Sequence, residues 1–314
     1  MATFTGTSTN VVEMVKSILT FLCDPATFGS GNEWKLVYPA IISDVADNII
    51  IKGVGDGEDD IYIGMSIKPA SATGQIDVLL NGFAGYDAGL EWREQPGGIN
   101  HVTVPTMSLL KDTFMTFWVS ATTSRIIIVV ELSTQYEGCY LGLMKPIAIE
   151  RQYPYPLVIG GSYYEGGLFA DTGPGHSIFA NPGTGIAKPA TGDYSTSLRI
   201  RRPDGSWRSG YNRNISNVSQ YYSDLCVWPT NTEPVRTLTV YDDVLTLENV
   251  IMFPFLLYES KPVGLIGQLD GIFWIGNRED ISAKDNILYN NKIYKVFNNV
   301  YRRDNDQYFA IEWA

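Results

Sequence analysis

Short strand-like runs separated by turn residues constrain the fold of this 314-residue chain more than any other feature. Runs rich in Val, Ile, Thr, Tyr and Trp recur along the chain, and 30 glycines and 16 prolines interrupt them. This punctuation is typical of strands joined by tight turns and leaves little room for long helices. The sequence therefore predicts a mainly β fold: an antiparallel β-sandwich or barrel-like composite with one N-terminal amphipathic helix and long loops.

One segment, residues 10–24, has the apolar spacing of an amphipathic helix. Asn10 can cap its start, and Glu13 can reach back to the Asn10 backbone. Asp24-Pro25 ends it, because the residue before a proline avoids the α region. The apolar face that must be buried consists of Val11, Met14, Val15, Ile18, Leu19 and Leu22.

Turn residues predict which strands pair. Pro203, Asp204 and Gly205 supply a preset φ, a side chain that bonds the backbone, and a left-handed residue. Asn290 and Asn291 tolerate positive φ at the turn of a second hairpin. Further strands are predicted in "WKLVYPAI", on both sides of the loop in "NIIIKGVGDGEDDIYIGMSI", and as a hairpin in "FMTFWVSATTSRIIIVVELS".

We expect residues 1–314 to form one composite β domain. A Gly/Pro-rich excursion, residues 166–192, joins two candidate lobes, residues 1–165 and 193–314. Loops of this length in a compact domain are usually functional or interfacial. No internal repeat or linker accompanies the excursion, which favours one domain over two.

The stretch "DQYFAIEWA" near the end of the sequence alternates in the manner of a strand. Phe309, Ile311 and Trp313 share one face, which we expect to seal the core of the protein itself. The opposite face carries Tyr308, Ala310 and Glu312, and we expect it to meet solvent or a partner.

Net charge narrows the classes of partner. The chain carries −11 with a pI near 4.7, which disfavours nucleic-acid binding, since that needs Lys and Arg to neutralise phosphates. The exception is "LRIRR" at residues 198–202, which we interpret as a solvated strand edge. The longest apolar runs, "IIIVV" and "IMFPFLLY", are too short to span a bilayer as helices, so no membrane insertion is predicted.

Metal and redox chemistry have little support in the sequence. Cys23, Cys139 and Cys226 lie far apart, and with only His101 and His176 beside them no zinc site has the usual spacing. We interpret the cysteines as reduced, buried, small apolar residues of a protein folded in a cytosol. "MATFTGTSTN" lacks the cationic start of a secretion signal, and no metal or cofactor is predicted.

Catalytic motifs are equally sparse, so we expect a protein that is not an enzyme. "IGGSYY" lacks the second glycine of a nucleophile elbow. The acidic loop "KGVGDGEDD" does not follow the register of a calcium loop, and we interpret it as a solvated turn. One enzymatic alternative stays open: Glu91 and Glu94 beside Trp92 could serve as the paired carboxylates of a glycosidase.

Two surfaces are candidates for protein contact. Tyrosines around two prolines and a glycine pair form an extended segment with little charge, which suits either contact or coverage of the protein's own sheet. Basic residues beside the last strand could dock an acidic surface of a neighbouring copy. The candidate interface residues are Tyr153, Tyr155, Tyr163, Tyr164, Lys292, Lys295, Arg302 and Arg303.

The motifs between Thr5 and Trp313 resemble a known class of proteins by their order, although no single motif is specific to that class. The capped helix is followed by "GNEWKLV", "DDIYIGMSI", "GYDAGLEWREQPG", "ERQYPYPLVIGGS", "LRIRRPDGSWRS", "CVWP", "GQLDGIFWIGN" and "IYKVFNNVYRRDNDQYFAIEW". This series resembles virion structural proteins of tailed bacteriophages. The resemblance implies a tail, neck (collar) or baseplate component that assembles as a symmetric ring with other virion proteins, and it supplies no catalytic residues.

The resemblance and the composition together imply a subunit folded in the host cytoplasm and located in the virion. A different class of function stays open, namely a host-surface glycan-binding module of the tail. In that case Trp92, Trp207 and the tyrosine segment would stack on sugar rings.

Overall fold

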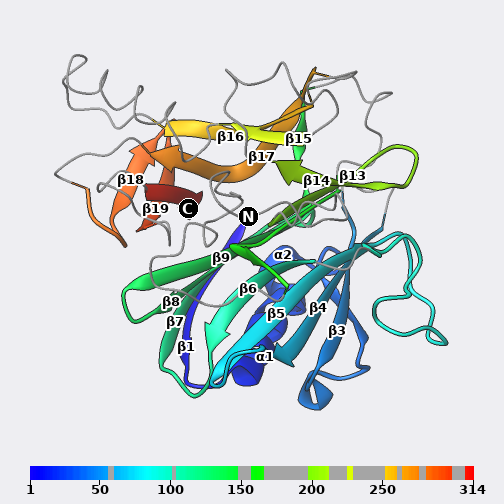
Figure 1. Ribbon diagram of the computed structural model, residues 1–314. Coiled ribbons are helices and arrows are strands. Elements are labelled where there is room, and N and C mark those ends of the chain that lie inside the picture. The colour runs from blue at the N-terminus through cyan, green and yellow to red at the C-terminus, as the bar shows by residue number, and fades with distance from the viewer. Residues whose placement is uncertain are drawn as a thin grey trace.

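The protein is mainly β, as the sequence predicts, with two α-helices and many antiparallel strands among the residues described (Figure 1). The computed structural model describes residues 1–55, 60–100, 104–147, 157–165, 197–211, 225–228, 252–259, 264–275, 281–298 and 308–314. The excursion at residues 166–192 and its strand "HSIFA" lie outside these ranges. The arrangement of the candidate lobes as one composite domain stays a prediction.

The smaller sheet has six strands in the order β12-β6-β5-β4-β3-β2, all antiparallel. Its outer face is covered by the chain between β5 and β6, where Trp92 and Ile99 are buried. The strands are β2 (Lys35–Tyr38), β3 (Asn48–Gly53), β4 (Ile61–Pro69), β5 (Gln75–Phe83), β6 (Pro105–Leu110) and β12 (Tyr163–Tyr164).

The larger sheet has fourteen strands and runs β1-β7-β8-β9-β11-β13-β14-β15-β16-β17-β20-β19-β18, with β10 paired to β17. Every pair is antiparallel except β14 with β15. Its first half contains β1 (Ala2–Ser8), β7 (Met115–Ala121), β8 (Arg125–Leu132), β9 (Gln135–Leu143), β11 (Leu157–Gly160), β13 (Leu198–Arg201) and β14 (Trp207–Tyr211). The short β10 (Lys145–Pro146) lies beside β17 of the second half. Its second half contains β15 (Leu225–Trp228), β16 (Met252–Glu259), β17 (Gly264–Ile275), β18 (Asn286–Tyr289), β19 (Lys292–Asn298) and β20 (Tyr308–Glu312).

Strands β7, β8 and β9 form a central layer that is buried on both faces (Figure 1). Alternate residues of β8 show this: Ile128 packs with the smaller sheet and α1, whereas Ile127 packs with β16, β17, β19 and β20. A strand buried on both sides is a continuous apolar run rather than an alternating one. This explains "IIIVV" in β8 and places the C-terminal strands as a third layer.

Helix α1 (Val11–Leu22) buries the predicted apolar face, and Asn10 caps it by accepting hydrogen bonds from the Val12 and Glu13 backbone. The predicted return contact from Glu13 is wrong. The Asn10 N–H instead donates to Ser8 Oγ, and Glu13 pairs with Lys16 at 3.1 Å. The predicted stop is followed by a short helix, α2 (Pro25–Phe28), because proline fits the first helical position and Asp24 caps it.

The predicted hairpin turns are confirmed. Asn290 and Asn291 have φ values of 48° and 60° between β18 and β19. Gly205 has a φ of 83° between β13 and β14, where the Ser206 N–H donates to Asp204 Oδ1. A 3-10 turn, η1 (Ile42–Asp44), completes the regular elements. None of the helices described is long and apolar enough to cross a membrane.

Two expectations about exposure are wrong. "LRIRR" does not form a solvated edge: β13 lies between β11 and β14, and Arg199 is fully buried. The second face of β20 is not open to solvent either, because Ala310 and Glu312 are buried. Ala310 packs in a small cluster with β17 and β19, and Glu312 pairs with cations of β8 and β19. The first face behaves as predicted, with Phe309 and Ile311 in the core and Trp313 partly buried against it.

Candidate functional site

The two basic residues of the candidate interface that are described bind within the chain itself. Lys292 Nζ lies 2.5 Å from Glu312 Oε1. Lys295 Nζ lies 5.6 Å from the centre of the Trp313 ring and donates to the Lys284 carbonyl. Burial lowers the pKa of Lys295 below its usual range. Much of the positive charge predicted to dock a neighbour is therefore engaged by β20 and the residues beside it.

The other candidate contacts are described only in part. Tyr163 is half-buried on β12, at the edge of the smaller sheet, and Tyr164 continues that strand. The side chain of Tyr164 lies outside the described part of the structure, as do Tyr153, Tyr155, Arg302 and Arg303.

Arg125 is the centre of a buried ionic network that joins the central layer to the C-terminal strands. Its Nε donates to Asp270 of β17 at 2.8 Å, and its Nη2 donates to Glu312 of β20 at 3.1 Å. Lys145 also pairs with Asp270, and Lys292 pairs with Glu312. Three cations and two carboxylates therefore alternate along the network, which satisfies charges that would be costly to bury alone.

Backbone geometry keeps room for this network. Gly271 has a φ of 70°, and a Cβ at that position would lie 2.1 Å from Arg125 Nη2. Tyr140 also contributes: its hydroxyl donates to the Leu143 carbonyl and accepts from the Asp270 N–H. Burial alone would raise the pKa of Asp270, but Arg125 and Lys145 lower it below its usual range.

Apolar side chains extend from the core onto the surface of the β18–β19 hairpin. Leu288 pairs across strands with Ile293, and the Trp313 N–H donates to the Ile293 carbonyl at 2.7 Å. Trp313 is partly buried, Ile293 is 37% exposed and Leu288 is 73% exposed. We call Leu288, Ile293 and Trp313 the apolar row. The apolar row runs from the end of β20 across β19 to β18, the last strand of the larger sheet, whose outer edge pairs with no other strand described.

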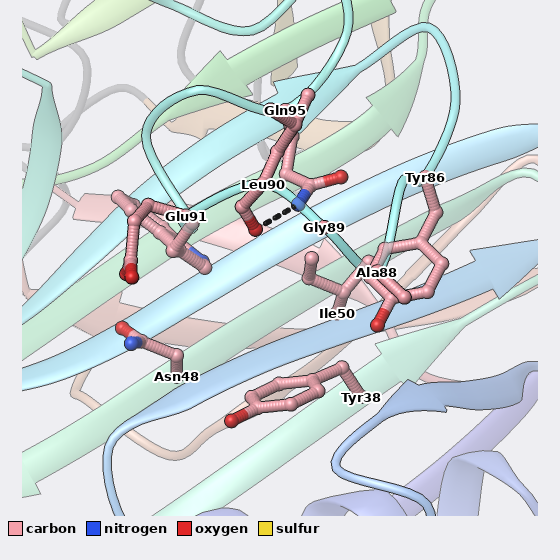
Figure 2. A pocket seen from close by; sticks show the side chains of 10 residues that line it. Tyr38, Asn48, Ile50, Tyr86, Ala88, Gly89, Leu90, Glu91 and Gln95 are labelled. Carbon is pink, nitrogen blue, oxygen red and sulfur yellow. Dashed lines mark hydrogen bonds between the residues drawn. The ribbon is translucent and has the colours of Figure 1, made fainter.

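A pocket of about 190 Å³ lies on the outer face of the smaller sheet (Figure 2). Its floor comes from β3 and the end of β2, and the segment at residues 86–95 covers it. Gln95, which is 3% exposed, fixes that segment, because its Nε2 donates to the Asp87 and Leu90 carbonyls and its Oε1 accepts from the Asp87 N–H. The lining residues are Tyr38, Asn48, Ile50, Tyr86, Ala88, Gly89, Leu90, Glu91, Trp92 and Gln95.

Only one of the two carboxylates of the glycosidase hypothesis lines the pocket. Glu91 lines it and is exposed; Glu94 is exposed but does not line it. Trp92 is 5% exposed and packs edge-on against Phe83, and Trp207 is 8% exposed. Neither indole therefore forms an open platform for stacking. This contradicts the expectation that Trp92 and Trp207 would stack on sugar rings. No local sequence pattern indicates this pocket, because its aromatic rings and amide groups come from separate segments of the chain.

Further buried acids lie around β5 and β6. Asp77 accepts a hydrogen bond from Ser108 at 2.9 Å, and burial raises the pKa of Asp77 to about 6. Ser162, the serine of "IGGSYY", donates to buried Glu137 and is followed by β12 rather than a helix. Glu165 pairs with Arg93. Among the residues described, no group of three or more His, Cys, Asp or Glu side chains could hold a metal ion.

The two cysteines whose side chains are described are free thiols. Burial raises the pKa of Cys139 to about 12 and that of half-buried Cys23 to about 11. Thiols with such pKa values form little thiolate near neutral pH, which agrees with the structural interpretation of these residues. His101, His176 and residues 56–59 of the acidic loop at residues 52–60 lie outside the described ranges. In that loop, Lys52 pairs with Asp60 at 2.5 Å.

Comparison with protein-family models and with curated proteins finds no match to this chain.

Proposed function

We propose that this protein is a structural subunit of a tailed-bacteriophage virion, in the tail, neck (collar) or baseplate. It folds in the host cytoplasm and then assembles as a symmetric ring with other virion proteins. The sequence resemblance names the class of protein. The apolar row is the one structural observation that supports a role in assembly.

The apolar row suits assembly for two reasons. Leu288 and Ile293 are cross-strand neighbours on one face of a hairpin, so their exposed areas form one patch rather than scattered contacts. The patch also lies at a sheet edge that pairs with no other strand in the described part of the chain, and such an edge can accept a further strand or a neighbouring surface. Subunit interfaces bury such surfaces and gain stability from them.

Mass spectrometry of purified particles tests the proposal, and we expect the protein in several copies per virion. Leu288→Lys should fold with unfolding free energy within about 0.5 kcal/mol of wild type, because the side chain is exposed. The variant should not be incorporated, since the lysine would place a charge in the interface. The matched control is Phe114→Lys, at a residue that is 61% exposed and lies between β6 and β7. Absence of the protein from particles, or normal incorporation of Leu288→Lys, would contradict the proposal.

Glycosidase activity is a weaker alternative, since Glu94 does not share the pocket with Glu91. If it were correct, Glu91→Gln and Glu94→Gln would each abolish hydrolysis of host envelope polysaccharide. We expect no such hydrolysis from the wild-type protein.

A further inference from the structure

The pocket under residues 86–95 is preformed rather than a gap between mobile side chains. Gln95 makes three hydrogen bonds to the backbone of that segment, and the Gly89 N–H donates to Asp87 Oδ1 at 2.8 Å. Figure 2 shows the bond from Gln95 to the Leu90 carbonyl above the floor strands. A buried glutamine with both ends of its amide satisfied holds the covering segment in one conformation. A ligand would then bind without the cost of ordering that segment.

The lining offers both aromatic faces and hydrogen-bonding groups. Figure 2 shows Asn48 and Glu91 on one side of the pocket, Tyr86 opposite them and Tyr38 near its base. Tyr38 is 47% exposed, so one ring is open for contact. Asn48 Oδ1 accepts a hydrogen bond from Ser66 at 2.7 Å, which assigns its Nδ2 group as a donor for a ligand. The Glu91 carboxylate forms no ion pair with any residue described, so it can accept hydrogen bonds.

Size and charge then select a class of ligand. A volume of about 190 Å³ is below the roughly 300–1,000 Å³ of pockets for drug-sized ligands, so the ligand is about as large as one sugar ring. The Glu91 carboxylate and the net charge of −11 oppose an anion such as a sugar phosphate. Hydroxyl groups that both donate and accept match a carboxylate beside an amide, and the C–H face of a pyranose matches a tyrosine ring.

We propose that this pocket binds one neutral hexopyranose unit, through stacking on Tyr38 and hydrogen bonds to Asn48 and Glu91. Trp92 is among the lining residues but is only 5% exposed, so the open ring for stacking is that of Tyr38. The proposal is independent of the assembly role, because the pocket lies on the smaller sheet and the apolar row lies on the larger one.

Ligand-observed NMR titration of the full chain tests the proposal, with methyl glycosides of glucose, mannose and galactose as probes. We expect saturable binding of at least one glycoside and markedly weaker binding of glucose 6-phosphate. Tyr38→Ala and Glu91→Gln should each weaken binding about tenfold or more, the equivalent of one lost contact of about 1.4 kcal/mol. The matched control is Glu94→Gln, a neighbouring exposed carboxylate outside the pocket, which should leave binding unchanged.

Each outcome decides the matter. Absence of saturable binding for all three glycosides overturns the proposal, and so does binding that survives both Tyr38→Ala and Glu91→Gln. Equal loss in Glu94→Gln would point to a general charge effect and would also overturn it. An unchanged melting temperature shows that each variant is folded, which we expect because all three side chains are exposed. If a glycoside binds, titration with a host polysaccharide that ends in the same sugar tests the source of the ligand. Binding of the polysaccharide points to a cell-surface glycan, and binding of the glycoside alone points to the free sugar.

Discussion

The central strands β7–β9 hold the smaller sheet and the C-terminal strands in different ways. Toward the smaller sheet and α1, the buried residues are mainly Ile, Val, Leu and Met. Toward the C-terminal strands the core is rich in aromatic rings; for example, the ring centroids of Phe297 and Trp118 lie 5.0 Å apart. This part of the core also borders the Arg125 network. The gain from aliphatic burial is non-directional and roughly proportional to the area buried, whereas ring contacts and ion pairs also depend on orientation.

The contrast implies that the C-terminal layer depends more on oriented ring contacts and ion pairs than the smaller sheet does. That layer also carries the apolar row. A subunit that assembles through this layer would transmit strain from its neighbours to the Arg125 network. The smaller sheet, with its pocket, would be less affected.

The largest expected effect comes from Arg125→Met. The substitution leaves Asp270 with one cationic partner and removes the buried partner of Glu312. Losing one member of a buried ion pair costs about 3–5 kcal/mol, and denaturant titration should show a loss of that size. Lys145→Met is the control, because Lys145 is 58% exposed and its pair should contribute less than about 1 kcal/mol. Similar losses of unfolding free energy in both variants would contradict the claim that the stabilisation comes from the buried ion pairs of Arg125.

Two neighbouring residues of β8 test the two faces separately. Ile127→Ala and Ile128→Ala should each lower the unfolding free energy by about 2–5 kcal/mol, since both side chains are fully buried. Ile127→Ala should weaken the C-terminal layer, and Ile128→Ala the contact with the smaller sheet. Near-UV circular dichroism can separate them, because more rings lie on the Ile127 side. Indistinguishable spectra for the two variants would argue against distinct faces.

A smaller effect is expected from Gln95→Leu, which disrupts the pocket segment alone. The Asp87 N–H and the Leu90 carbonyl would lose their Gln95 partner, at a cost of about 1–3 kcal/mol, whereas the Asp87 carbonyl would still accept from the Leu90 N–H. Glycoside binding should be lost with the pocket, while incorporation into particles should be retained. Simultaneous loss of incorporation would show that pocket and apolar row are coupled.

The smallest effects concern pH, and they have opposite signs in the two regions. The pKa of Asp270 is lowered, so its contribution to stability is present above the unfolded value of 3.8 and is lost as pH falls further. The pKa of Asp77 is raised to about 6, so its contribution is complete below about 3.8 and is lost as pH rises toward 6. Asp77→Asn should therefore flatten the stability curve between these values. An unchanged curve would contradict the raised pKa.

Local patterns predicted the elements but not how they are layered. Helix α1, its cap and the turns at Asn290 and Gly205 follow from residues close in sequence. The continuous apolar run "IIIVV" is typical of a strand covered on both faces, but the run alone does not indicate which elements cover it. The apolar face of β20 was predicted, and its buried second face was not, because Ala310 and Glu312 look like surface residues out of context.

The sites depended on contacts between distant segments. Arg125 is 145 residues from Asp270 and 187 from Glu312, so no spacing rule connects them. The pocket likewise joins Tyr38 and Asn48 to Glu91 through the fold of the smaller sheet. Of the predicted contact residues, the sequence correctly located the hairpin of Lys292 and Lys295, but it missed that both bind within the chain.

Hydrogen exchange on the Arg125→Met variant tests the separate attachment of the C-terminal layer most directly. The amides of β17 and β20 should exchange faster than in wild type, because their strands lose the ionic contact to β8. The amides of β4 and β5 should keep their wild-type protection, since the aliphatic face is unchanged. Equal acceleration in both sheets, or unchanged protection of β17 and β20, would contradict the claim that the two faces are held independently.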